Sequence, residues 1–363
     1  MTLVPGESIT QAADPICVLP FGTLVVGLCG RNGPIRWEER EEMKTIHLGV
    51  VVLATTLMWL NPARPADRTE ITFPGDHAYP ESLSATSDGT IYAGSLYEGG
   101  IFRVLPGATT AEQWIKSGAN DSMITLGVLA DEKADTLWVC SSNLTGFGVK
   151  PPAGDKPVSL KAFDLENGAG KGSWPLPGDK SLCNDMVVGA DGAAYVTDSF
   201  QPHILKLTPG ATSLEVWATD AGFGGEGPQL DGITIGQDGN VYANTYASGR
   251  LFRIEMGPGG KAGRITQLNT TPGFEHPDGM RAFGKNGLLV VEGANAGRFD
   301  IIELNGDNAE VKTVKSGFKQ PVSVWQMGNT AWVLEGQLAT LFDPPEKRGT
   351  PGPFRAYAVE LPR

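Results

Sequence analysis

Side chains that carry oxygen recur at one register along this chain. Glu81, Asn184, Asp231 and Asp278 each stand at the head of a short apolar strand, eleven residues before a large apolar or aromatic residue of the next strand. Carboxylate and amide oxygens are the ligands that Ca²⁺ and Mg²⁺ take in proteins. Three carboxylates held together without a cation would repel, which raises the pKa of at least one of them. If the fold gathers these heads, the residues predict a site for a hard divalent cation.

The same eleven-residue spacing occurs six times, and successive heads are 43 to 57 residues apart. This period is typical of propeller blades, each a four-stranded antiparallel sheet. In a propeller the innermost strand of each blade runs along the central axis, so heads at equal register meet around one opening. The sequence therefore predicts an all-β, six-bladed β-propeller. The six pairs are Glu81 and Tyr92, Gly127 and Trp138, Asn184 and Tyr195, Asp231 and Tyr242, Asp278 and Leu289, and Pro321 and Trp332.

The third unit shows the internal order expected of a blade. Residues 186–188 and 193–196 are apolar strands around the Gly-Ala-Asp-Gly turn at 189–192, and residues 204–207 and 214–217 follow as third and fourth strands. The sixth unit ends with its third strand at 354–359. We expect residues 69–73 to supply the missing fourth strand, so that pairing of the N- and C-terminal strands closes the ring and removes exposed sheet edges.

Composition supports this fold and excludes some partners. The chain has 48 glycines, 26 prolines and 19% charged residues, as expected of many short strands joined by tight turns. The net charge is −12, without a basic stripe. Nucleic acid and anionic membranes are therefore not expected partners. We expect a monomer that binds a small-molecule substrate.

The first 66 residues predict a separate leader. Residues 1–42 are interpreted as a non-native upstream extension, and residues 43–66 as a signal peptide, because a basic start precedes an apolar run over 46–60. Residues 67–363 then form the propeller domain, secreted or periplasmic and free of the membrane after cleavage. An uncleaved membrane anchor is the alternative. In an oxidising compartment Cys140 and Cys183 could form a disulfide or remain two buried thiols.

Other polar residues are weaker candidates for the pocket. His77 and His276 fall just before two heads, and Asp198, Glu292 and Glu335 lie at the ends of second strands, where they could line the pocket wall. An ordinary alternative exists for the heads as well, because Asp-Gly and Asn-Asp pairs often occupy turns before strands.

Short motifs give the chain a resemblance to a known family. Pro80-Glu81-Ser82, Asn184-Asp185, and Leu230-Asp231-Gly232-Ile233 followed by Asp238-Gly239 resemble the gluconolactonase and regucalcin family of six-bladed propellers, which shares its architecture with calcium-dependent phosphotriesterases. The resemblance covers roughly residues 70–361. It implies that Glu81, Asn184 and Asp231 hold a divalent cation and that Asp231 is also the general base. Family members often carry an asparagine on the second blade where this register holds Gly127; Asp278 could compensate as a fourth ligand or as the base.

The expected function is metal-dependent hydrolysis of lactones or related esters. A divalent metal, Ca²⁺ first and Mg²⁺, Mn²⁺ or Zn²⁺ as alternatives, would polarise the carbonyl while Asp231 or Asp278 accepts a proton from water. Two alternatives from other classes stay open. One is a non-catalytic propeller in which the metal is structural and the opening binds a ligand. The other is a metal-independent propeller resembling strictosidine synthase.

Overall fold

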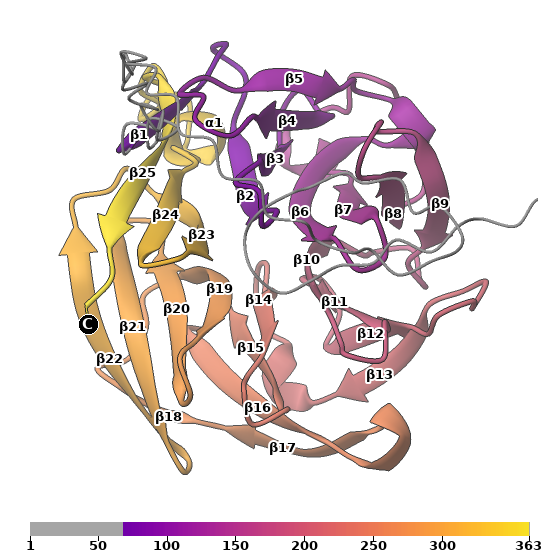
Figure 1. Cartoon of the computed structure of the whole chain (residues 1–363), viewed down its shortest axis with the longest axis vertical. Helices are drawn as coiled ribbons and strands as arrows, with labels where there is room; N and C mark the ends of the chain where they lie inside the picture. The colour runs from indigo at the N-terminus through magenta and orange to yellow at the C-terminus, as the bar shows by residue number, and fades with distance from the viewer. Residues whose placement is uncertain (1–67, 363) are drawn as a thin grey trace, which may run out of the picture. The chain divides into compact units, whose positions relative to one another are not determined.

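The computed structural model describes residues 68–362, so the predicted upstream extension and signal peptide lie outside the described residues. Six antiparallel sheets are arranged around a common axis (Figure 1). The predicted all-β, six-bladed propeller is confirmed. Among the residues that the structure describes, no helix has the length and apolar character needed to cross a membrane.

In five blades the four main strands follow sequence order from the axis outward, and in the sixth the outer position is taken by the first strand of the described chain. The innermost strands are β2 (Pro80–Ala85), β6 (Ile124–Asp131), β10 (Cys183–Val188), β14 (Leu230–Ile235), β19 (Pro277–Phe283) and β23 (Pro321–Met327). The second strands are β3 (Ile91–Ser95), β7 (Thr136–Ser142), β11 (Ala194–Asp198), β15 (Val241–Thr245), β20 (Gly287–Glu292) and β24 (Thr330–Glu335). The third strands are β4 (Ile101–Val104), β8 (Ser159–Asp164), β12 (His203–Leu207), β16 (Arg250–Met256), β21 (Arg298–Asn305) and β25 (Phe354–Glu360). The outer strands are β5 (Glu112–Ile115), β9 (Gly170–Pro175), β13 (Glu215–Thr219), β17 (Ala262–Gln267), β22 (Asn308–Ser316) and β1 (Glu70–Phe73).

Short elements occupy the connections. The strand β18 (Asn269–Thr271) pairs in parallel with β22 at the edge of the fifth blade. The single α-helical turn of the described region, α1, follows β24 and contributes to the opening described below. The helical segments are η1 (Ala119–Asp121), η2 (Thr145–Phe147), η3 (Ala221–Phe223), η4 (Pro258–Gly260) and α1 (Ala339–Phe342).

Local sequence explains the hairpins. Between β10 and β11 the backbone N–H of Gly192 donates to the carbonyl of Gly189 at 2.9 Å, and Gly192 has φ +81°, which glycine adopts without steric cost. The Asp191 carboxylate accepts from the N–H of Ala193 at 3.1 Å. Such turns fix the register of the strands, and with it the position of each head at the axis.

The ring closes as predicted. The strand β1 pairs antiparallel with β25, from Glu70 opposite Tyr357 to Phe73 opposite Phe354. The first and last described strands thus complete the sixth blade, where an unpaired edge would otherwise remain.

The large residues of the second strands pack between blades. Tyr195, Tyr242 and Leu289 are buried, as are Tyr92 and Trp332 at the equivalent positions. The innermost strands also contact their neighbours around the whole ring, and the buried apolar residues pack in several clusters. This burial accounts for the regular spacing between the polar heads and the large residues.

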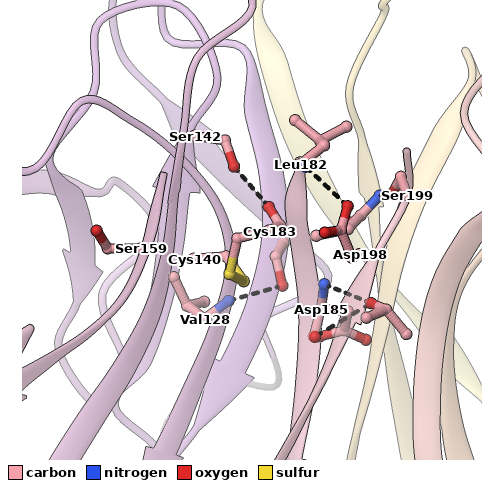
Figure 2. Close-up of a disulfide and its surroundings, with 12 residues drawn as sticks. Val128, Cys140, Ser142, Ser159, Leu182, Cys183, Asp185, Asp198 and Ser199 are labelled. Carbon is pink, nitrogen blue, oxygen red and sulfur yellow. Dashed lines mark hydrogen bonds between the residues drawn. A yellow bond between two sulfur atoms is a disulfide. The ribbon is translucent and has the colours of Figure 1, made fainter. Parts of the chain in front are cut away.

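A disulfide joins the second and third blades (Figure 2). Cys140 of β7 and Cys183 of β10 are bonded, with their Cα atoms 5.1 Å apart. The Ser142 hydroxyl also donates to the carbonyl of Cys183 at 2.8 Å. Of the two alternatives left open by the sequence, the structure shows the disulfide. Since Cys183 directly precedes Asn184, the bond fixes the backbone at one of the heads.

Candidate metal and catalytic site

A β-bulge at the start of each innermost strand turns the heads toward the axis. In the third blade Cys183 pairs with Asp198 and Met186 with Val196, so Asn184 and Asp185 lie opposite one residue. The same two-against-one arrangement holds Glu81 in the first blade, Asp231 in the fourth and Asp278 in the fifth. Bulges interrupt strict alternation and redirect side chains. The Asp-Gly pairs are therefore parts of strands, and the interpretation of them as turns before strands is wrong.

The bulges also correct two of the six heads. In the second blade Leu126 and Gly127 occupy the bulge, and Leu129 pairs with Trp138, which makes Leu126 the equivalent of Asp231. In the sixth blade only Val322 lies between the paired residues Pro321 and Ser323. The heads are thus Leu126 and Val322 rather than Gly127 and Pro321, because the hairpins of these two blades differ by one residue from the other four.

Glycine after the head is required by close approach of neighbouring strands. A Cβ atom on Gly127 would lie 2.3 Å from the carbonyl oxygen of Asn184, and one on Gly232 would lie 2.6 Å from that of Asp278. Real Cβ atoms do not tolerate such distances to backbone. The glycines therefore let successive innermost strands, and so successive heads, come together.

Side chains of the second strands hold the heads in place. The Thr197 hydroxyl lies opposite the third bulge and donates to the carbonyl of Asp231 at 2.8 Å. In the next blade the Asn244 amide accepts from the N–H of Gly232 at 3.0 Å and donates to the carbonyl of Asp278 at 2.7 Å. Buried backbone groups need such partners. These hydrogen bonds fix the heads of blades three, four and five relative to one another.

The four polar heads meet on the floor of one cavity of about 330 Å³. Glu81, Asn184, Asp231 and Asp278 all line it, as does Leu126. The Asn184 amide nitrogen donates to Asp231 Oδ2 at 3.0 Å and to the Ser199 hydroxyl at 2.9 Å. Both amide hydrogens are thereby used, which leaves the carbonyl oxygen of Asn184 as its ligating atom.

The floor is a cluster of carboxylates with perturbed proton affinity. Burial, then the charge of Asp185, raises the pKa of Asp231 to about 7, although the hydrogen bond from Asn184 opposes this. Burial, followed by the charges of Asp231 and Glu81, raises the pKa of Asp278 well above its ordinary value. Burial and the charges of Asp231 and Asp185 do the same for Glu81. Such mutual effects show that the three carboxylates share one electrostatic environment.

The chemistry of this floor fits a divalent cation. Glu81 Oε2 is buried without a hydrogen-bond partner, which is costly for a carboxylate unless a cation or proton neutralises it. Three carboxylates and an amide oxygen form the hard donor set that Ca²⁺ and Mg²⁺ prefer. Over residues 68–362, no three His, Cys, Asp or Glu side chains already stand at ligand spacing around one point. The fit to a cation rests on the chemistry of this donor set, with Asn184 as a further oxygen ligand, and not on ligand spacing already present.

A buried ion pair lies beneath the floor. Arg281 of β19 donates to both carboxylate oxygens of Asp185, at 2.6 and 3.2 Å, and its guanidinium stacks over Trp325 at 5.3 Å. Asp185 Oδ2 also accepts from the N–H of Ile233 at 3.3 Å. The pair ties blades three, four and five together directly under the carboxylates, and the Arg281 charge opposes the rise in the pKa of Glu81.

Replacing Arg281 with Met is expected to destabilise the fold by roughly 3–5 kcal/mol, because Asp185 is left as an uncompensated buried charge. Urea unfolding at pH 7 measures the loss. The double variant Asp185→Asn with Arg281→Met should recover most of it. The matched control is Arg264→Gln, which breaks an exposed pair with Glu255 at 3.0 Å and should cost under about 1 kcal/mol. Equal losses in R281M and R264Q would contradict a structural role for the buried pair.

Tyr246 forms one side of the site, and His276 supports it from behind. Tyr246 lines the cavity, and burial with the charges of Asp278 and Asp231 raises the pKa of its phenol. The phenol is therefore a neutral hydrogen-bond donor beside the carboxylates. His276 packs behind it with ring centroids 5.0 Å apart, and does not line the cavity itself. His77 is exposed and stacks on Tyr97 at 4.8 Å, away from the lining.

The acids at the ends of second strands have a backbone role. The Asp198 carboxylate accepts from the N–H of Leu182 at 2.9 Å (Figure 2), and Glu335 accepts from that of Lys319 at 2.7 Å. Glu292 likewise accepts from the N–H of Glu275 and from Arg298 at 2.8 Å. The expectation that Asp198, Glu292 and Glu335 line the pocket wall is wrong. They instead anchor the loop that leads into the innermost strand of their own blade.

The chain matches no protein-family profile. It also matches no curated protein sequence. Solved structures, in contrast, share its architecture at low identity. One is a protein provisionally described as a gluconolactonase, at 12% identity and a TM-score of 0.56, covering 82% of this chain and 96% of the other.

Two enzymes of other classes show the same likeness. An inactive virginiamycin B lyase from Staphylococcus aureus with quinupristin is 16% identical, with a TM-score of 0.54, covering 79% of this chain and 82% of the other. The PQQ-bound aldose sugar dehydrogenase from Streptomyces coelicolor is 14% identical, with a TM-score of 0.53, covering 80% and 97%. At these identities the likeness establishes the propeller fold, and chemistry has to be argued from the site.

Proposed function

We propose that this chain is a metal-dependent hydrolase of lactones or related esters, similar in action to gluconolactonases. The observation that carries the proposal is the convergence of Glu81, Asn184, Asp231 and Asp278, from four blades, on the floor of one cavity. Held by these oxygens, a divalent cation such as Ca²⁺ would polarise the substrate carbonyl and balance the negative charge that develops there.

The chain's own residues supply the proton transfers. Asp231 is the proposed general base: Asn184 holds its Oδ2 at 3.0 Å, and the carboxylate lies at the floor of the cavity where the carbonyl would bind. Asp231 accepts a proton from the water that adds to the carbonyl carbon. The ring C–O bond then breaks, and the same proton passes to the departing oxygen, which yields a hydroxy acid. Tyr246 is positioned to donate a hydrogen bond to the substrate. Asp278 is the alternative general base.

The proposal is tested with a panel of lactones and simple esters, with and without chelator. Proton release at pH 7.5 measures ring opening. We expect hydrolysis that EDTA abolishes and Ca²⁺, Mg²⁺, Mn²⁺ or Zn²⁺ restores. Stabilisation by metal without hydrolysis would instead support a binding propeller, and activity insensitive to chelator would support a metal-independent enzyme of the strictosidine-synthase type. The Cys140–Cys183 disulfide supports the further proposal that the protein works in an oxidising compartment outside the cytoplasm.

A further inference from the structure

The walls of the cavity differ in chemistry from its floor. Above the carboxylates the lining is dominated by aliphatic and aromatic side chains from the loops and strand heads of several blades and from α1. The leucine and phenylalanine side chains cannot donate or accept a hydrogen bond, and they outnumber the polar wall residues Tyr246, Gln320 and Asp343. The wall residues used in the argument are Leu96, Leu126, Leu144, Phe147, Leu182 and Phe342.

Leu126 places an apolar side chain in the ring of heads itself. It stands between Glu81 and Asn184 in the order of the blades, and it is 3% exposed. A substrate hydroxyl seated against Leu126 would give up its hydrogen bonds to water without replacement. The loss expected for one such buried hydroxyl is roughly ten- to a hundredfold in affinity.

Phe147 brings an aromatic face to the same cavity. It lies on η2, is 49% exposed and stacks on Phe200 with ring centroids 5.6 Å apart. Large exposed apolar side chains are uncommon in the described part of the chain, and this one lines the opening above the carboxylates. An exposed aromatic ring at the rim of a cavity gains free energy when an apolar group covers it.

From these walls we infer that the preferred substrate carries an alkyl or aryl group, seated against Leu126, Leu144 and Phe147, with its carbonyl at the acidic floor. Polyhydroxylated sugar lactones are discriminated against. This inference rests on the proposed function for its reaction, but the walls select the ligand whether or not it reacts. A cavity of about 330 Å³ lies in the size range of small-molecule sites.

A homologous series of γ-lactones with linear side chains tests the inference. We expect kcat/KM to rise about fourfold for each added methylene until the wall is covered, which corresponds to ~0.8 kcal/mol for each buried methylene. Glucono-δ-lactone should be the poorest substrate. A flat series, or a sugar lactone that reacts as well as the best alkyl lactone, would overturn the inference.

Substitution of Phe147 identifies the surface responsible. Phe147→Ser removes apolar area at a half-exposed position, so folding should persist, and the loss in kcat/KM should grow with side-chain length. Val216→Asn is the matched control, because Val216 is 52% exposed on the outer strand β13 and should leave the series unchanged. Leu126→Asn should in addition narrow the gap between alkyl and sugar lactones. Equal chain-length dependence in F147S and the unmodified protein would count against the assigned wall.

A binding measurement separates failure of this inference from failure of the proposed reaction. The neutral fluorophore N-phenyl-1-naphthylamine is bound to the protein and displaced by each lactone in turn. Displacement by alkyl lactones that weakens in F147S, without any hydrolysis, would uphold the apolar site and reject the hydrolase. Hydrolysis of glucono-δ-lactone without displacement by alkyl lactones would uphold the hydrolase and reject the apolar site.

Discussion

Replacing Asp231 with Asn is expected to lower kcat/KM on the best lactone by roughly a thousandfold or more while the propeller stays folded. A general base contributes about 10²–10⁴ in rate, and the same substitution removes a ligating oxygen from the proposed cation site. Stopped-flow or steady-state proton release measures the loss, and circular dichroism checks the fold. Asp191→Asn, in the hairpin turn of the third blade, is the matched control and should keep full activity.

A stability measurement separates this role from a structural one. Because burial raises the pKa of Asp231 to about 7, its charged form lowers the stability of the metal-free folded protein at higher pH. D231N should therefore unfold at a higher temperature than the unmodified protein at pH 8 in chelator. A purely structural Asp231 would give the opposite shift. Full activity in D231N would remove Asp231 from the mechanism and leave Asp278 as the base to test.

The repeated spacing in the sequence predicted the propeller because each blade packs against its neighbours in the same way. The large residue of the second strand is buried in five blades and partly buried at Trp138, and the eleven-residue interval holds in four of the six units. The interval is one residue longer at Leu126 and one residue shorter at Val322, because the hairpins of these two blades differ in length from the others. Spacing alone does not reveal a bulge, so the register of these two heads needed the structure.

The supporting residues were harder to predict than the heads. Asp185 and Arg281 are 96 residues apart and carry no common motif, yet they form a buried pair under the carboxylates. Thr197 and Asn244 act through the bulge opposite them, and the sequence alone gave no sign that a strand threonine or asparagine faces the next head. Only Asp185 had a visible signal, because it directly follows Asn184 and a bulge turns both inward.

The same limit explains the misplaced acids. Asp198, Glu292 and Glu335 share a register at the ends of second strands, as the heads do at the starts of first strands. A common register shows a common role but not which role. Here the role is acceptance of backbone N–H bonds from the preceding loop. The loop walls above the floor, including Phe147 and Phe342, follow no repeat and could not be derived from periodicity.

Calcium is expected to stabilise the chelator-treated protein strongly at pH 8 and weakly at pH 5. Between the ordinary carboxyl pKa and about 7, the folded floor keeps protons that the unfolded chain has released, so the unfolding free energy of the metal-free protein falls as pH rises. A cation bound only to the folded state adds about 2.7 kcal/mol when its concentration is a hundred times its Kd. Protons compete with the cation for the same carboxylate oxygens. The stabilisation by Ca²⁺ therefore increases as the carboxylates lose their protons at higher pH.

Melting temperatures are measured with and without Ca²⁺ from pH 5 to pH 8.5 at constant ionic strength. The difference between the two values reports the carboxylates at the cavity floor. Asp300 also has a pKa raised to about 7, through burial and then its interaction with Glu292, but it contributes the same slope with and without cation and cancels in the difference. D231N should shrink the calcium effect at every pH. If Ca²⁺, Mg²⁺, Mn²⁺ and Zn²⁺ all fail to shift unfolding at pH 8, the carboxylates are neutralised by protons alone, and a metal-independent use of the cavity becomes the better account.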